Sequence, residues 1–114
     1  MPIVAIMVYV ADVEAGLHWY QQAFPSAKRK SISEPFFEFL DVNGVSIEIV
    51  PADEKVSSGA AGSVAYWHVA DFDFALRHMQ SIGATLYRGP ADIEAGKRIC
   101  QVRDPWGNCI GLRG

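Results

Sequence analysis

The chain begins with a short apolar run of mostly β-branched and aliphatic residues, positions 3–10, which predicts a buried strand. Asp12 follows and is suited to cap a helix whose apolar positions recur every three to four residues up to about Phe24. The apolar stripe of this helix consists of Val13, Leu17, Tyr20 and Phe24. Pro25 comes directly after it and predicts that the helix ends there.

Three further strands are predicted in the first half, at about 27–33, 36–42 and 45–50. The last two are joined by Asn43-Gly44, the pair that a type I′ hairpin turn favours. The first half therefore reads as a βαβββ module.

The second half repeats this order after the segment 51–62, whose Ser, Gly and Ala residues are typical of a flexible linker. Val69-Ala70-Asp71 matches Val10-Ala11-Asp12 and again precedes a helical pattern. The elements expected in this half are a strand at 64–69, a helix to Ser81 closed by Gly83, and strands near 85–88, 97–103 and 108–112. We expect one α+β domain, 1–114, made of two tandem βαβββ modules, 1–50 and 63–114.

Alternation along the strands assigns their residues to two faces. In each module the helix is expected to cover the more apolar face of the sheet. The opposite faces are expected to curve around a concave cavity that holds a ligand. The residues predicted to line this cavity are Met7, Tyr9, Phe39, Glu48, Tyr66 and His68.

Composition limits the classes of function. The 114 residues are half hydrophobic and one-fifth charged, which is typical of a globular protein. A net charge of −3 and a single short basic run, 28–30, argue against a nucleic-acid partner, and no apolar run approaches the ~20 residues of a membrane span. No signal-peptide pattern is found, so we expect a cytoplasmic protein in which Cys100 and Cys109 are small, reduced core thiols.

Several short motifs carry a likeness to a known family. They are Val10-Ala11-Asp12-Val13 with Trp19-Tyr20 in the first half, and Asp71, Gly83-Ala84 and Asp104-Pro105-Trp106-Gly107-Asn108 in the second. In these motifs the chain resembles, over essentially its whole length, the vicinal oxygen chelate superfamily. This superfamily includes glyoxalase I, extradiol dioxygenases, fosfomycin-inactivating transferases and bleomycin resistance proteins. The resemblance implies the same paired βαβββ architecture.

The metal enzymes of that superfamily hold a divalent ion with one side chain from each of four strands. Carried over by motif, the resemblance places these positions at Ala5, Glu48, Val64 and Gly111, of which only Glu48 is a metal-ligand type. His68 lies four residues from Val64, about 13 Å along a strand, and does not replace it. We therefore expect no metal and no other cofactor.

The leading hypothesis is a metal-independent protein that binds a small, partly aromatic or amphipathic organic molecule, similar to the sequestering bleomycin resistance proteins. The alternative is a glyoxalase-like lyase or isomerase, or a dioxygenase, with a relocated metal or with Glu48 and His68 as acid and base. A regulatory or interaction module is a third hypothesis. Glu48 either receives a ligand or is neutralised by a neighbour such as Arg98. We expect a homodimer, with exchange of modules through 51–62 left open.

Overall fold

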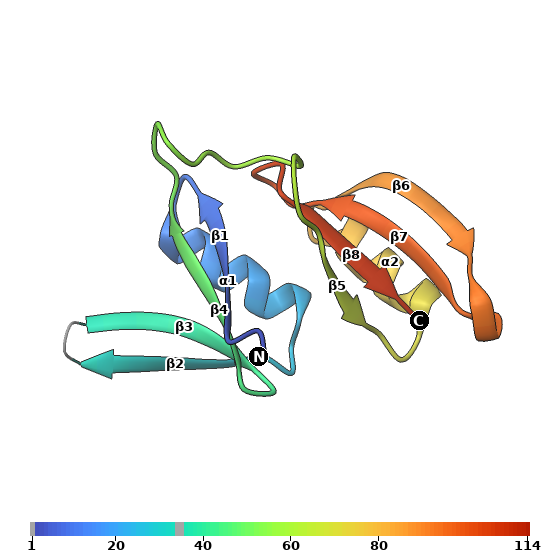
Figure 1. Ribbon diagram of the computed structural model, residues 1–114, viewed down its shortest axis with the longest axis horizontal. Coiled ribbons are helices and arrows are strands. Elements are labelled where there is room, and N and C mark those ends of the chain that lie inside the picture. Colours follow the sequence, from blue (N-terminus) through green and yellow to red (C-terminus); the bar gives the residue numbers. More distant parts are fainter. Residues whose placement is uncertain (1, 34–35) are drawn as a thin grey trace. The chain divides into compact units, whose positions relative to one another are not determined.

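The computed structural model describes residues 2–33 and 36–114 and shows an α+β protein with two helices and two four-stranded sheets in these residues (Figure 1). The chain forms two compact units, 1–58 and 59–114. Each unit has the element order βαβββ, which confirms the predicted fold class.

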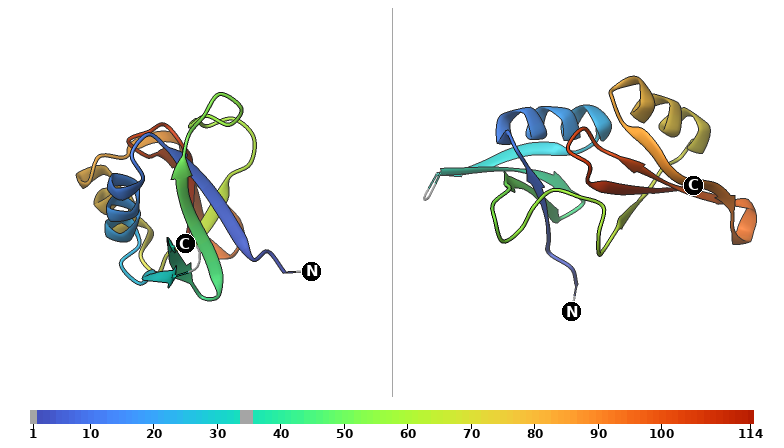
Figure 2. Two further views of the ribbon diagram at one scale, coloured as in Figure 1. Left: turned by 90° about the vertical axis from the view of Figure 1, so that its left-hand side faces the viewer. Right: turned by 90° about the horizontal axis from the view of Figure 1, so that it is seen from above.

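The first unit has a mixed sheet in the strand order β1-β4-β3-β2, with β1 parallel to β4 and the other pairs antiparallel. The helix lies on one face of this sheet (Figure 2). Its elements are β1 (Ala5–Val10), α1 (Val13–Ala23), β2 (Lys28–Ser33), β3 (Phe36–Val42) and β4 (Val45–Pro51).

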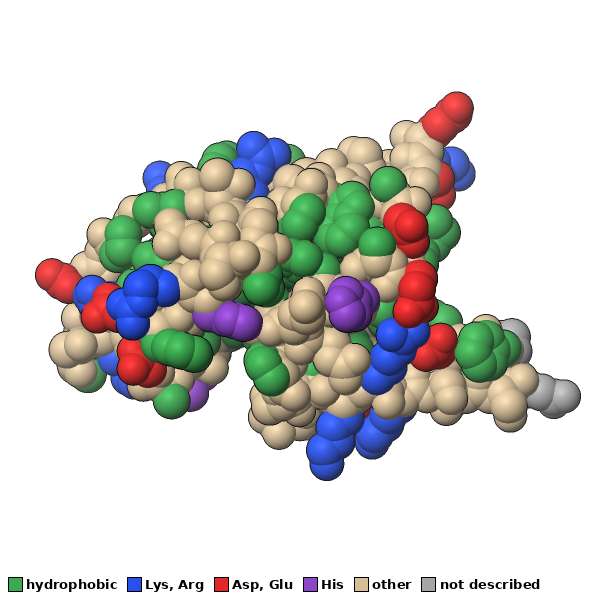
Figure 3. Space-filling view, turned by 180° about the vertical axis from the view of Figure 1, so that it is seen from behind, with side chains coloured by type: hydrophobic (Ala, Val, Ile, Leu, Met, Phe, Trp, Pro, Cys, Tyr) green, Lys and Arg blue, Asp and Glu red, His purple; other side chains and the backbone are tan. Residues whose placement is uncertain are grey.

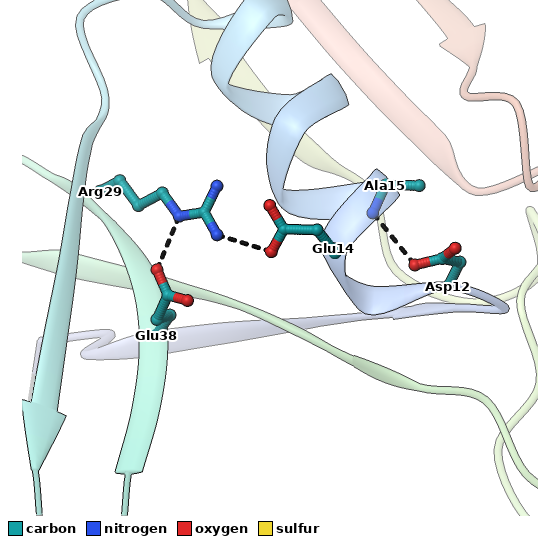
Figure 4. Close-up of polar contacts among 5 residues, drawn as sticks. All are labelled: Asp12, Glu14, Ala15, Arg29 and Glu38. Atoms are coloured by element: carbon teal, nitrogen blue, oxygen red, sulfur yellow. Dashed lines mark hydrogen bonds and ion pairs between the residues drawn. The ribbon is translucent and has the colours of Figure 1, made fainter.

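Helix α1 begins and packs as its sequence predicts. The Asp12 carboxylate accepts a hydrogen bond from the backbone N–H of Ala15 at 3.1 Å, which satisfies one of the free donors of the first turn (Figure 4). Leu17 and Tyr20 are almost completely buried. Gly16 lies so close to the sheet that a Cβ there would come within 2.6 Å of Ile49 Cγ2. The core of this unit therefore depends on close helix–sheet contact.

An ion-pair network links α1 to the sheet on the helix-covered side. Arg29 on β2 donates to Glu38 on β3 at 2.8 Å and to Glu14 on α1 at 2.7 Å (Figure 4). The hydrogen bond from Arg29 lowers the pKa of Glu38, and the two carboxylates raise the pKa of Arg29. Figure 3 shows basic and acidic side chains next to one another on one face of the molecule.

The second unit repeats the arrangement with the strand order β5-β8-β7-β6, β5 being parallel to β8. Helix α2 lies on one face of this sheet (Figure 2). Its elements are β5 (Ala65–His68), α2 (Phe72–Ser81), β6 (Thr85–Asp92), a 3-10 turn (Glu94–Gly96), β7 (Arg98–Arg103) and β8 (Cys109–Arg113).

The turn between β7 and β8 is built around one buried carboxylate. Asp104 is 3% exposed and accepts hydrogen bonds from the backbone N–H groups of Trp106 and Asn108 at 2.9 and 2.8 Å. It also accepts one from the Asn108 side chain at 3.1 Å. The Asp-Pro-Trp-Gly-Asn motif thus serves to shape this turn.

Two details differ from the sequence-based expectation. Strand β6 extends to Asp92 rather than ending near Arg88, and it is irregular around the cis peptide bond between Gly89 and Pro90. The two thiols are free, but only Cys100 lies in the core. Cys109 is half-buried on the other face of the sheet, because its partner in the β-ladder is Arg103 and the buried positions of β7 are Cys100 and Val102.

No helix in the described ranges is both long enough and apolar enough to cross a membrane.

Candidate functional site

Side chains on the open face of the second sheet, the face away from α2, lie in rows that cross all four strands. The register of the strands defines two central rows. The first row consists of Tyr66, Gly111, Gln101 and Arg88. The second row consists of His68, Arg113, Ile99 and Ala91. Each row combines apolar or aromatic surface with a cationic side chain.

The ring of Tyr66 lies over Gly111. A Cβ built on Gly111 would come within 2.6 Å of Tyr66 Cγ, so the ring occupies the space that any other residue at 111 would need. The missing side chain lets Tyr66 lean across β8, where its hydroxyl accepts a hydrogen bond from Gln101 Nε2 at 2.9 Å. The position of the tyrosine ring is therefore set by a glycine on one neighbouring strand and an amide on the next.

Gln101 is held from its other side as well. The Cys109 thiol donates to Gln101 Oε1 at 3.3 Å. Burial raises the pKa of Cys109, with a smaller opposing effect from Arg103, so the thiol keeps its proton at neutral pH and remains a donor. The amide of Gln101 retains one N–H and one acceptor lone pair for a ligand.

A hollow of about 320 Å³ lies beside this tyrosine. The residues that line it include Tyr66, Arg88, Gly89, Ala91, Ile99 and Gln101. Gly89 has a φ of +83°, and a Cβ there would lie 3.0 Å from the carbonyl oxygen of Ile99. The irregular part of β6 thus needs a glycine in order to form this wall.

A second, smaller hollow of about 220 Å³ shares Tyr66 and Ile99 with the first. Here Arg113 donates to Glu94 at 2.9 Å. His68 is the cross-strand partner of Arg113 and is exposed. Because they share Tyr66 and Ile99 as lining residues, the two hollows adjoin one another on the open face of the second sheet and together make up the candidate site.

Four of the six predicted ligand-contacting residues belong to the first unit, and the structure brings them onto one face. Met7 and Glu48 are cross-strand partners, and Tyr9 lies two positions after Met7. Phe39 directly precedes Leu40, which faces the helix, so its side chain lies on the same open face as Glu48. Its ring stacks on Phe37 at 6.0 Å between centroids. The expectation that these four share a cavity with Tyr66 and His68 stays a prediction.

The suggested partner of Glu48 was wrong. Glu48 accepts a hydrogen bond from the Ser46 hydroxyl at 3.1 Å, whereas Arg98 pairs with Asp73 on α2 at 2.8 Å. Arg98 also lies over the ring of Phe72, at 4.7 Å from its centroid. This helix-side packing removes Arg98 from the open face.

Gln101, Arg88 and Ile99 were missed as site residues. The side chains of β7 could not be assigned to faces because the length of the following turn was uncertain. The signal was present in Cys100 and Val102, whose apolar alternation marks the helix side and leaves Gln101 on the open face.

The residues do not fit a metal ion at the positions that the superfamily resemblance implies. Ala5 and Val64 carry no donor atom, and Glu48 alone supplies oxygen ligands. At Gly111 the Tyr66 ring fills the space that a ligand side chain would enter. In addition, no group of three His, Cys, Asp or Glu within either unit is suited to hold a metal, as far as residues 2–33 and 36–114 are concerned.

The fold and this open sheet face define a class of small α+β proteins built from two βαβββ modules. The family model described as the Glyoxalase/Bleomycin resistance protein/Dioxygenase superfamily matches residues 3–112, and the chain belongs to this superfamily.

Solved structures of the same architecture are similar to almost the entire chain. One is a glyoxalase/bleomycin resistance protein/dioxygenase family enzyme from Burkholderia phytofirmans PsJN, with 20% identity, a TM-score of 0.75, and coverage of 99% of this chain and 98% of that chain. A superfamily member from Sphaerobacter thermophilus has 17% identity, a TM-score of 0.77, and coverage of 99% and 96%. TioX from Micromonospora sp. ML1 has 17% identity, a TM-score of 0.71, and coverage of 99% and 98%. At these identities the likeness concerns the fold. None of the curated proteins matches the chain.

Proposed function

We propose that this protein binds a small, partly aromatic organic molecule without using a metal ion, in the manner of a sequestering member of its superfamily. The observation that carries the proposal is the placement of Tyr66 over Gly111, which puts an aromatic ring where a metal-ligating side chain would otherwise project. The hollow beside this ring is mainly apolar with a few polar groups, the composition that small-molecule sites favour.

The open face of the first sheet supports the same proposal. It offers the stacked rings of Phe37 and Phe39, the thioether of Met7 and a single carboxylate, Glu48. Aromatic rings and a flexible methionine suit apolar ligands. A single carboxylate can orient a ligand through a hydrogen bond but does not chelate a metal ion.

The first experiment is to measure the metal content of untagged protein purified without chelator, followed by titration with zinc, nickel, manganese and iron(II). We expect no stoichiometric metal and no change in Tm with any of them. Saturable, near-stoichiometric metal would contradict the proposal and favour the relocated-metal enzyme.

A ligand screen follows. Aromatic and amphipathic compounds are tested for a concentration-dependent rise in Tm, and the bound compound is recovered and weighed by mass spectrometry. We expect the recovered compound to be chemically unchanged. We expect the Tyr66→Leu variant to bind it more weakly. Phe74→Leu is the matched control because Phe74 is an exposed aromatic residue on α2, 60% accessible. Turnover that is lost in Glu48→Gln would instead support the acid–base enzyme.

We also propose that the protein acts as a cytoplasmic homodimer. Light scattering distinguishes the 12.5 kDa mass of one chain from twice that value. A monomer that still binds ligand would show that ligand binding does not require dimerisation.

A further inference from the structure

We infer that the hollow beside Tyr66 is built for a flat aromatic molecule that carries a carboxylate. This inference rests on the proposed function and names the class of ligand that the second unit would take. It is argued from the charges, the aromatic surface and the register of the strands around the hollow.

The charged side chains around the hollow are mostly cationic. Among residues 2–33 and 36–114, Arg88 is the one charged residue that lines the 320 Å³ hollow, and no carboxylate lines it. Arg103 lies in the next row, over the ring of Tyr87 at 5.3 Å from its centroid. Within the described part of the chain, Glu94 is the only acidic residue lining either hollow, and it pairs with Arg113. The open face of this unit therefore attracts anions.

The side chain of Arg88 is exposed and differs in its ion pairing from other arginines of the chain. Three other arginines, Arg29, Arg98 and Arg113, each form an ion pair with a carboxylate. Arg88 has no ion-pair partner among the residues that the structure describes. A guanidinium of this kind presents a planar fork of N–H donors that matches a carboxylate. Arg88 is thus available to an incoming anion.

The flat ring of Tyr66 forms one wall of the hollow. The ring is backed by Gly111 and hydrogen-bonded at its hydroxyl to Gln101, so its position in the folded protein is defined. Ile99 and Ala91 add apolar surface from neighbouring strands. A flat ring system gains most from such a surface, because it can stack on the tyrosine and cover the aliphatic side chains together.

Gln101 connects the aromatic end of the site, Tyr66, with the cationic end, Arg88. Gln101 is the cross-strand partner of Arg88 and the hydrogen-bond donor to Tyr66, so it lies between the cation and the ring. The backbones of Tyr66 and Arg88 are three strand spacings apart, about 14 Å. The Tyr66 ring leans across β8 and its hydroxyl reaches Gln101 on β7, the strand next to Arg88, so only one spacing of about 4.8 Å separates the end of the ring from the strand of Arg88. A ligand that stacks on Tyr66 can therefore point its carboxylate at Arg88 and use the free N–H of Gln101.

The test compares 2-naphthoate with the uncharged 2-naphthamide, which has the same ring system. Each compound is titrated into ¹⁵N-labelled full-length protein, and the shifts of backbone amides on both open sheet faces are followed. We expect 2-naphthoate to shift Gln101 and Gly111 saturably and to bind at least about fivefold more tightly than 2-naphthamide at low salt. The difference should shrink as salt is added, because Arg88 is exposed.

Two variants assign the preference to its residues. Arg88→Gln should bring 2-naphthoate to the affinity of 2-naphthamide, whereas Arg77→Gln, an exposed arginine on α2, should leave the preference intact. Tyr66→Leu should weaken both compounds by about fivefold.

Equal affinities of the two compounds, or a preference that survives in Arg88→Gln, would overturn the carboxylate inference while leaving the proposed function in place. Saturable binding to the first unit alone would overturn it in the same way. If neither these compounds nor any member of the wider aromatic library shifts an amide on either open face, the proposed function fails together with the inference.

Discussion

The contact between Tyr66 and Gly111 leads to a quantitative prediction about Gly111→Ala. A Cβ at this position would lie 2.6 Å from Tyr66 Cγ, which is closer than real atoms approach, so the ring must move away. The ring is the movable partner because Tyr66 is 44% exposed and the surrounding strand backbone is held by its ladder. We therefore expect the backbone to remain in place and the tyrosine to swing outward.

The cost follows from the contacts that are lost. Displacing the ring breaks the hydrogen bond from Gln101, worth about 1 kcal/mol, and removes van der Waals contact with β8 of roughly 0.5–1 kcal/mol. Alanine in a strand offsets about 0.5–1 kcal/mol of this relative to glycine. Gly111→Ala should thus destabilise the protein by roughly 0.5–1.5 kcal/mol when Tyr66 is present.

The sign should reverse when the ring is absent. In a Tyr66→Ala background the three nearest contacts of the new methyl group are absent, because all three are atoms of the tyrosine ring, so Gly111→Ala should stabilise by about 0.5–1 kcal/mol. The glycine-to-alanine term cancels in the comparison, so the double variant should be more stable than the sum of the single changes predicts by roughly 1.5–2 kcal/mol. Urea unfolding of the wild type, both single variants and the double variant, followed by tryptophan fluorescence, measures this coupling.

An additive result would refute the reasoning. Independent sites agree with additivity to within about 0.3–0.5 kcal/mol, so a coupling below that range would mean that the Tyr66 ring does not lie over Gly111. Matched ligand titrations add a second readout, because a displaced ring should also weaken 2-naphthoate binding.

Three further predictions concern the framework. Gly16→Ala should destabilise by about 1 kcal/mol, because overpacking against Ile49 exceeds the gain in helix propensity. The loss should be smaller in an Ile49→Ala background, where Val10 Cγ2 at 3.0 Å is the remaining close contact, and urea unfolding of the four proteins decides this. Asp104→Ala should lower the free energy of unfolding by about 2 kcal/mol because it leaves half-buried donors unpaired, and Asp104→Asn by less; equal losses would contradict the hydrogen-bond account. Arg29 lowers the pKa of Glu38, so this carboxylate contributes stability above its unfolded pKa of about 4.3 that is lost as the pH falls through the folded value. Glu38→Gln should therefore flatten the fall in stability below about pH 4.5, and an unchanged acid slope would count against the ion pair.

The sequence predicted the elements well where a local rule acts. Asp12 and Asp71 cap their helices through hydrogen bonds at 3.1 and 3.0 Å, as their position before an apolar repeat indicated. Asn43 and Gly44 both have positive φ, as a type I′ turn requires. Caps, turns and helical periodicity depend on residues close together in the chain, so these features are visible without a structure.

The second-unit site was harder to predict because it depends on contacts between strands. Every residue of β6 is exposed, so its sequence shows no burial alternation, and Gly89-Pro90 resembles the end of a strand. The role of Gly111 is visible only when Tyr66 is seen across the ladder. Neither the hollow nor the availability of Arg88 follows from spacing along the chain.

The two repeats agree where folding constrains them and differ where it does not. Both have an aspartate helix cap and a parallel pair between the first and last strands of the module. On the open faces of these strand pairs the residues differ completely, because Met7 faces Glu48 in one unit and Tyr66 faces Gly111 in the other. A side chain on an open face contributes little to the core, so its identity is free to follow the ligand. Membership in the superfamily therefore explains the scaffold, whereas the proposed ligand is inferred from these face residues, with Tyr66, Gln101 and Arg88 as the group to change first.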